Sequence, residues 1–144
     1  MSQLNFDDLE IGQSITPYQK EITLVQNVMY ASATWDFFRI HYDAEYARNK
    51  GLKGPVCDGQ MLGALLVRMV SEWAGEAASL KRLKLSYKKM AYVGDTLKFT
   101  GRVRCKSSVN CENQVICELS IENQKGEIIV SDAEAVLSFR SIEK

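Results

Sequence analysis

The stretch "GQMLGALLVRMVSEWA", Gly59 to Ala74, decides the fold of this chain. Asp58 just before it is a suitable N-cap, and Gly75 just after it is a suitable terminator. Apolar residues recur along it at helical spacing and also occupy much of the remaining helix surface. One face is formed by Leu62, Leu65, Leu66, Met69 and Trp73. A helix that is apolar nearly all round is a buried one, so we predict a long central helix enclosed by the rest of the chain.

After this helix the hydrophobic pattern changes to strict alternation, which indicates β-strands with one buried face. Four such segments follow one another, at residues 80–90, 95–105, 113–124 and 127–141. Turn residues separate them, at Gly94–Asp95, Asn110 and Lys125–Gly126. Short turns join antiparallel neighbours, so we expect an antiparallel run of strands.

The residues before the central helix predict a strand and then a helix. Residues 13–23 read as a strand, and Pro17 places it at a sheet edge because proline has no N–H to donate to a neighbouring strand. Thr23 and Gln26 have the spacing of a capping box. They open an amphipathic helix that we expect to run from Leu24 to about Ala33.

An irregular connection and a second short helix complete the first half of the chain. The connection is "WDFFRIHY", residues 35–42, and the helix follows at residues 43–51 with Asp43 as N-cap and Gly51 at its end. Helices followed by a run of strands favour the α+β class. The simplest packing is one domain over residues 1–144, in which a curved antiparallel sheet wraps the central helix. This arrangement is the hot-dog architecture.

The composition excludes several classes of protein. Hydrophobic residues make up 46% and charged residues 25% of the 144 residues, which is typical of a globular domain. Eighteen basic and 18 acidic residues cancel, so no global field attracts nucleic acid or an anionic membrane. The most apolar segment, residues 61–73, is too short to span a bilayer and is interrupted by Arg68 and Glu72.

The N-terminus and the cysteines indicate the compartment. The opening "MSQLNFDDLEIG" has neither a basic nor an apolar leader region, so we expect a cytoplasmic protein. Its four cysteines are then expected as reduced thiols. One histidine and no C-x-x-C pair cannot complete a usual zinc set, so no metal site is expected.

The only histidine, His41, lies five positions after Asp36 among aromatic residues. A spacing of five does not place both side chains on one helical face, so the pair needs a bend between them. Two interpretations stay open: a core histidine fastened to a carboxylate, or an acid–base pair that holds a water and moves a proton. The start of the central helix adds a second feature, because the Gly59 N–H has no intrahelical partner and can bind a developing oxyanion.

Three segments resemble the MaoC-like acyl dehydratases, the family of (R)-specific enoyl-CoA hydratases. They are "DFFRIHYDAEYARNKG", "GPVCDGQMLG" and "MAYVGDTLKFTGRV", and the resemblance covers roughly Gln13 to Phe139. The family carries D-x-N-P-x-H, then G-x-P-I-x-H-G-M at the start of the hot-dog helix, then P-V-x-x-G-D-T-L. The stretch from Ser71 to Val103 is similar to small subunits of MaoC-like hydratases that act on steroid side-chain CoA esters. Those subunits work as heteromers with a second hot-dog chain.

The resemblance implies a hydratase that adds water reversibly to a 2-enoyl thioester, with no cofactor. It makes Asp36 and His41 the catalytic dyad and the Gly59 N–H the donor to the thioester oxygen. The substrate would be an acyl-CoA or an acyl-carrier-protein thioester, and the assembly a homodimer or a hot-dog heteromer.

The chain departs from the family pattern beside the dyad and at the central helix. Phe38 and Arg39 replace Asn-Pro, Asp58 replaces a histidine, and Val67 stands where some members have serine. These changes leave the substrate open. Phe37 and Phe38 suit a bulky apolar acyl group, or they fill the core.

Further substrate contacts are expected at Cys57, Asp58 and Lys84. Cys57 is expected to line the site rather than to act as a nucleophile. Lys84 belongs to a basic cluster that suits CoA phosphates, although the solvated face of a strand is the favoured explanation of that cluster: Lys81, Arg82, Lys84, Lys88 and Lys89. Trp35 and Trp73 are assigned to the core.

Two rival functions remain. A hot-dog thioesterase would use the same pocket for hydrolysis and release a free thiol. A non-catalytic partner subunit would shape the pocket of a catalytic relative. In each case we expect at least a dimer, because a lone curved sheet leaves an edge to cover.

Overall fold

The central helix of the computed structural model, α3 (Gly59–Ala74), has the bounds that the sequence predicts. The Asp58 side chain accepts the N–H of Gln60, and Gly75, with a φ of 58°, ends the helix. A short 3₁₀ turn, η2 (Gly75–Ala77), leads into the sheet. The structure describes residues 4–109 and 112–140.

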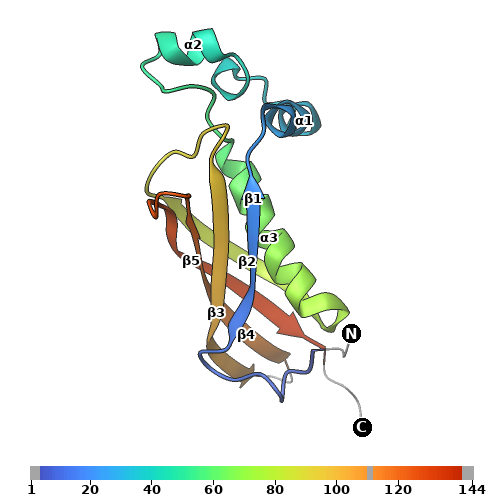
Figure 1. Ribbon diagram of the computed structural model, residues 1–144. Helices are drawn as coiled ribbons and strands as arrows, with labels where there is room; N and C mark the ends of the chain where they lie inside the picture. The colour runs from blue at the N-terminus through green and yellow to red at the C-terminus, as the bar shows by residue number, and fades with distance from the viewer. Residues whose placement is uncertain (1–3, 110–111, 141–144) are drawn as a thin grey trace.

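A single antiparallel sheet lies against α3 (Figure 1). Its five strands lie in the order β1-β3-β4-β5-β2, so β1 and β2 are the edges. The strands are β1 (Ser14–Glu21), β2 (Ala78–Tyr87), β3 (Thr96–Val109), β4 (Glu112–Glu122) and β5 (Ile128–Phe139). The expected α+β hot-dog fold and the edge position of the Pro17 strand are therefore confirmed.

The alternation of the strands produces the core. Along β4, Val115, Cys117, Leu119 and Ile121 are buried and the residues between them are partly exposed. They pack with Phe99 of β3 and with the inward face of α3. The predicted turn at Gly126 is present, and the glycine adopts a left-handed φ of 74° there. The predicted turn residue Asn110 lies outside the described residues.

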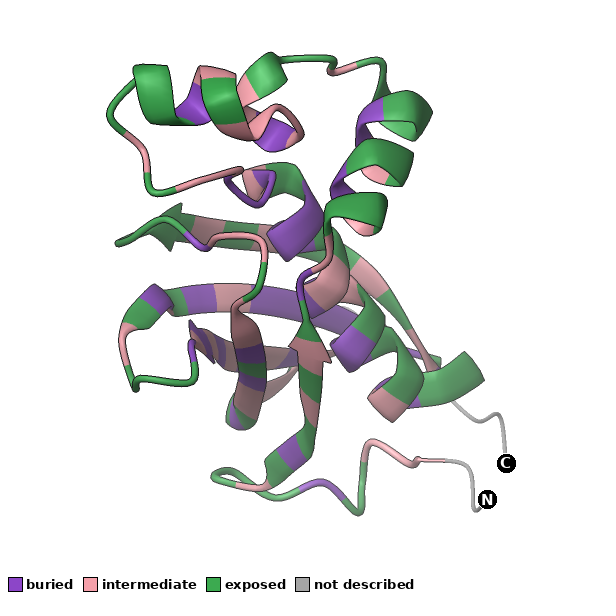
Figure 2. Ribbon diagram, turned by 45° about the horizontal axis from the view of Figure 1, so that its top comes forward, coloured by how far each residue is buried: buried purple, intermediate pink, exposed green. Residues whose placement is uncertain are grey.

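The predicted central helix is present, but it is not buried over its whole surface. Leu66 and Val70 are fully buried, but Ala64, Arg68 and Ser71 are exposed. The sheet covers only one side of the helix, and a second covering layer is not provided by the described residues of this chain. Figure 2 shows the exposed stripe along the helix.

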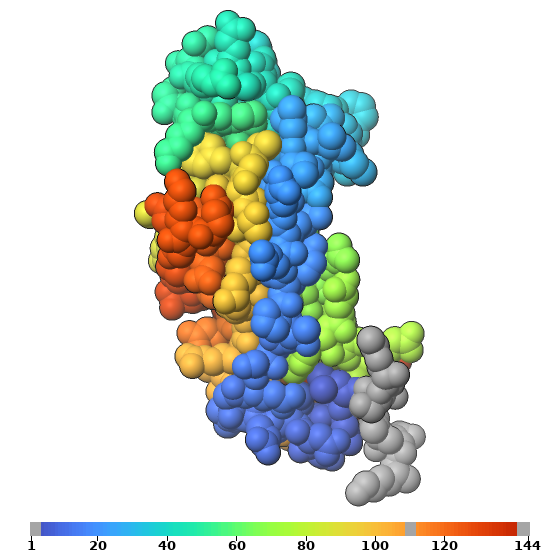
Figure 3. Space-filling view, viewed as in Figure 1, coloured from blue at the N-terminus to red at the C-terminus, as the bar shows by residue number. Residues whose placement is uncertain are grey.

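Residues 24–52 form a separate layer, here called the cap, at one end of the sheet (Figures 1 and 3). It contains α1 (Leu24–Thr34), the 3₁₀ turn η1 (Arg39–His41) and α2 (Ala44–Asn49). The predicted caps are present, with a complete Thr23–Gln26 capping box on α1 and the Asp43 side chain on the N–H of Tyr46. The sheet and α3 together are called the body.

Several smaller expectations can be compared with the structure. Trp35 was assigned to the core, but it ends α1 in a left-handed conformation and is 84% exposed, so that assignment is wrong. Trp73 packs partly buried against the core. Cys57, Cys105 and Cys117 are free thiols, and Cys111 lies outside the described residues. Among the described helices, none is both long enough and apolar enough to cross a membrane.

Candidate active site

The bend that the Asp36–His41 spacing requires is present in the cap. Trp35 reverses the chain with a φ of 57°, and the Phe38 N–H then donates to Asp36 Oδ1 over 3.3 Å. The turn η1 follows and carries His41 at its end. The structure thereby brings Asp36 and His41 together, and it adds Asp58: one polar atom from each of the three side chains lies within 4.8 Å of the others.

The imidazole of His41 is held in one tautomer. The ring is 9% exposed, and its Nδ1 lies 2.9 Å from the carbonyl oxygen of Val56. A carbonyl oxygen only accepts, so Nδ1 carries the hydrogen. In the neutral ring Nε2 then holds the free lone pair and is the nitrogen available to accept a proton. The edge of the Phe38 ring packs against the imidazole.

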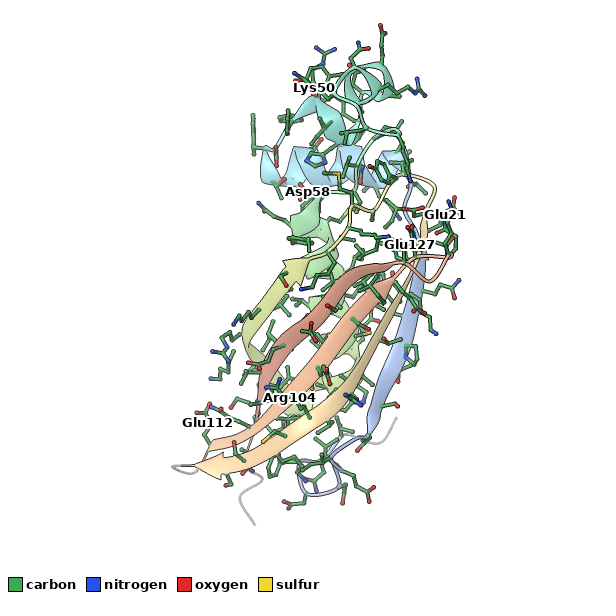
Figure 4. All side chains as sticks on the ribbon, turned by 90° about the vertical axis from the view of Figure 1, so that its left-hand side faces the viewer. Glu21, Lys50, Asp58, Arg104, Glu112 and Glu127 are labelled. Carbon is green, nitrogen blue, oxygen red and sulfur yellow. The ribbon has the colours of Figure 1, made fainter. Side chains whose placement is uncertain are left out.

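Asp58 has two roles that follow from its place at the seam between cap and body (Figure 4). Its Oδ1 accepts the Gln60 N–H over 2.7 Å and so caps α3, as predicted. Its side chain is also buried, at 5% exposure, within the cluster formed with the predicted dyad. Burial and then the charge of Asp58 raise the pKa of Tyr30 and of Tyr87.

Gly59 is the first residue of α3, so its N–H has no partner within the helix. The Tyr87 hydroxyl donates to the Gly59 carbonyl over 2.6 Å. A Cβ at position 59 would lie 3.0 Å from the Tyr87 ring, closer than most real contacts. The glycine therefore lets Tyr87 approach without a shift of its ring. Sequence reasoning did not single out Tyr87, because alternation along β2 assigned it only to a strand face.

A cleft of about 380 Å³ opens beside these groups and is more apolar than polar. His41, Cys57 and Gly59 line it together with Leu62, Tyr87 and Met90. Of the basic cluster, Lys88 and Lys89 line the cleft. Lys84 lies on β2 opposite Glu134 and is exposed.

Cys57 lines the cleft as an unreactive thiol. Burial, followed by the charges of Asp58 and Asp95, raises its pKa to about 12. The thiolate is the nucleophilic form of cysteine, so this side chain stays protonated at neutral pH. Its position fits a lining residue and gives no support to covalent catalysis.

Phe37 and Phe38 do not fill the core. They are 49% and 51% exposed, on the stretch between Asp36 and His41. Phe37 packs edge-on against Trp35, so three aromatic rings lie at the surface next to the acid–base cluster. Their exposure leaves them free to contact an apolar group.

A second hollow, of about 400 Å³, adjoins the cleft and shares Lys89 and Met90 with it. Lys53 and Lys125 also line it, and neither was singled out from the sequence. Glu127 lies there as well, paired with Lys89 over 2.8 Å. Hydrogen bonds from Lys89 and then Asn123 hold the pKa of Glu127 at about 2. The lysines are far apart in the sequence, so no local signal predicts this group.

The chemistry of the cluster follows from the polar groups of its three side chains. Two carboxylates and an imidazole can bind and orient one water and exchange a proton with it. The same three side chains could also ligate a metal ion, although the family resemblance implies no metal. The unpaired N–H at the start of α3 provides a place for negative charge that develops on a substrate oxygen.

A five-stranded antiparallel sheet against one long central helix is the hot-dog fold. Residues 8–124 match the family described as MaoC like domain, and this chain belongs to that family. A comparison with curated protein sequences gives no significant match.

Several solved structures share the fold. A chain of the ChsH1–ChsH2 complex from Mycobacterium tuberculosis is 27% identical, with a TM-score of 0.81 over 91% of this chain and 98% of that one. The R-hydratase PhaJ1 from Pseudomonas aeruginosa is 25% identical, with a TM-score of 0.84 over 96% and 92%. The (R)-hydratase from A. caviae involved in PHA biosynthesis is 22% identical, with a TM-score of 0.83 over 92% and 98%. The family and these neighbours support a hydratase or dehydratase of the hot-dog fold.

Proposed function

We propose that this chain adds water reversibly to the double bond of a 2-enoyl-CoA and yields a 3-hydroxyacyl-CoA. The observation that carries the proposal is the cluster of Asp36, His41 and Asp58, within 4.8 Å of one another, next to an apolar cleft and the free N–H at Gly59. Hydration of a conjugated thioester needs a base at the water, a proton for Cα, and a partner for the enolate-like oxygen.

Each group has a role in this reaction. Asp36 and the free Nε2 of His41 hold the water, and the pair takes one of its protons as oxygen bonds to Cβ. The pair returns a proton to Cα when the enolate collapses. The Gly59 N–H donates to the thioester oxygen throughout. We assign the transferred proton to the pair rather than to one of its residues. Asp58 acts as a further acceptor for the water or the hydroxyl product.

The choice of CoA as carrier rests on the neighbouring hollow. Lys53, Lys89 and Lys125 surround it, and only part of their charge is balanced by Asp95 and Glu127. Phosphates of a carrier whose thioester reaches the cleft would bind these ammonium groups. Phe37 and Phe38, exposed beside the cluster, suit a bulky apolar acyl group.

We further propose that the chain works as a homodimer or as a heteromer with a second hot-dog chain. The edge strand β2 is free along one side, and α3 is exposed on the side away from the sheet. Uncovered strand edges are usually paired or protected in folded proteins. A monomer in solution by light scattering would count against this assembly.

The test of the activity uses Asp36→Asn, with Asp132→Asn as a matched control. Asp132 is exposed on β5 at a φ of 55°, a conformation that asparagine tolerates. We expect the wild-type chain to remove the absorbance of the conjugated thioester, from a short or a bulky enoyl-CoA. Asp36→Asn should lose roughly 10²- to 10⁴-fold in rate, the usual contribution of a general base, and Asp132→Asn should lose none.

Other outcomes discriminate the rivals. Release of free CoA thiol would identify a thioesterase instead. A folded wild-type chain that is inactive alone on both substrates would contradict a self-sufficient hydratase and favour a partner subunit.

A further inference from the structure

Asn27 is a polar residue on the buried face of α1, and the formation of that helix does not require it. It is 1% exposed and faces the loop before α3. Its Nδ2 donates to the carbonyl oxygen of His41 over 2.8 Å and to that of Val56 over 3.0 Å. Burial of an amide is unfavourable unless it is hydrogen-bonded, so these two bonds fix where the side chain lies.

The orientation of this amide is determined by its partners. Both are carbonyl oxygens, which only accept, so the nitrogen of the amide must face them. Asn27 Oδ1 consequently points elsewhere, and it is buried with no hydrogen-bond partner among the described residues. An acceptor left unpaired in the interior destabilises the fold. Asn27 therefore holds two carbonyl groups in place at a cost to the stability of the fold, because its own oxygen is left unpaired.

The two carbonyls belong to the active-site frame. The Val56 oxygen accepts from Asn27 and also from Nδ1 of His41, over 2.9 Å. The Val56 N–H donates to the Ile40 carbonyl over 2.9 Å. Asn27 therefore holds the main chain of His41 and the acceptor of its ring at the same time. Residues from the cap and from the loop before α3 are joined through this one side chain.

We infer that Asn27 is a positioning residue, which acts through the Val56 carbonyl to hold His41 in the tautomer with hydrogen on Nδ1. A carbonyl fixed by a second donor keeps its position opposite Nδ1, and the lone pair of Nε2 then stays directed at the water. Without Asn27, the His41 carbonyl loses its donor and the Val56 carbonyl can rotate. The ring then gains access to the other tautomer, which carries the hydrogen on Nε2 and cannot accept a proton there. In this chain phenylalanine occupies the position of the family's motif asparagine, and Asn27 supplies an amide from a different element.

The single histidine of the chain makes a direct test possible. Long-range ¹H–¹⁵N NMR of the imidazole in a protein without a histidine tag reports only His41. We expect the wild type to show the Nδ1–H tautomer. Asn27→Asp keeps the shape and leaves at most one O–H donor in place of the two N–H donors of the amide, and Asn27→Leu removes all polar atoms. In both we expect a measurable population of the Nε2–H tautomer. Asn49→Leu, on an exposed site in α2, is the control and should leave the spectrum unchanged.

A kinetic readout rests on the proposed function. For enoyl-CoA hydration we expect the Asn27 variants to lose roughly 10- to 100-fold in kcat with little change in KM, as for other misplaced catalytic groups. Failure of the two proposals is distinguishable, because the spectrum does not depend on any activity.

Three results would overturn the inference. The first is an Nε2–H tautomer in the wild type. The second is an unchanged Nδ1–H tautomer in both folded variants. The third is loss of the fold in both variants by circular dichroism, which would make the role of Asn27 structural. If Asp36→Asn is as active as the wild type while the tautomer responds to Asn27, the proposed function fails and the inference stands.

Discussion

The body and the cap of this molecule are held together in different ways. The body buries a continuous core between the sheet and α3, with Phe99, Leu66 and Leu137 nearly inaccessible to solvent. The cap helices bury little beyond Asn27, Ala31 and Ala47. They leave a group of large apolar side chains exposed: Leu24, Val25, Val28, Met29, Trp35, Phe37 and Phe38.

This difference locates the vulnerable part of the candidate site. Asp36 and His41 belong to the cap, whereas Asp58 is the N-cap of α3, so the cluster of the three side chains exists only while the cap is docked on the body. Hydrogen bonds between the cap and the loop before α3 hold the cap in place, and Asn27 donates one of them, to the Val56 carbonyl. The exposed apolar side chains of the cap form a surface on which another protein surface can pack.

The largest effect should come from the core of the body. Leu66→Ala removes a fully buried side chain of α3 and should lower the free energy of unfolding by about 2–5 kcal/mol. Met29→Ala, on the cap at 66% exposure, should change it by less than about 0.5 kcal/mol. Urea unfolding of both variants measures the contrast. Equal losses would mean that the cap shares the core of the body.

The seam between the two regions can be probed through Cys57. Its pKa of about 12, against 9.0 for a free thiol, lowers the thiolate fraction at pH 8 by roughly 1000-fold. The pKa of Cys57 is higher in the folded chain than in the unfolded one. The contribution of the protonated thiol to the free energy of unfolding is therefore fully present below pH 9 and is lost as the pH rises towards 12. Alkylation mapped by mass spectrometry at pH 8 should therefore leave Cys57 intact while the half-buried Cys105 reacts.

The contrary outcome would also be informative. If Cys57 reacts at pH 8 as fast as it does in the unfolded chain, the cap leaves the body often, and the site is formed only part of the time.

The smallest effect should be confined to the cap. Thr23→Ala removes the side-chain half of the capping box, since the Gln26 N–H loses Thr23 Oγ1, whereas the backbone N–H of residue 23 can still donate to Gln26 Oε1. The expected loss is about 1 kcal/mol, felt locally in α1. Amide hydrogen exchange should accelerate in α1 and not in β4, and Thr16→Ala on the exposed edge should leave both unchanged. Acceleration throughout the sheet would show that the two regions unfold together.

Sequence reasoning predicted the local features of the fold and part of the site. It gave the bounds of α3, the caps at Thr23, Asp43 and Asp58, and the edge strand with Pro17, because each depends on neighbours within a few residues. It predicted a bend between Asp36 and His41 from their spacing alone. It failed for Trp35, because an aromatic residue looks the same in sequence whether it fills a core or caps a helix.

The sequence by itself therefore determined the pattern of helices and strands and the α+β class, since periodicity and capping are properties of neighbouring residues. It offered Asp36 and His41 as a candidate dyad only through the resemblance of their motif to a known family. Only the tertiary structure decided that Asp58 lies beside these two residues, that Asn27 holds Val56 from 29 residues away, and that Tyr87 reaches Gly59 from 28 residues away. Hydrogen bonds between distant residues leave no period in the chain. They exist because the packing of cap on body brings those particular groups within reach.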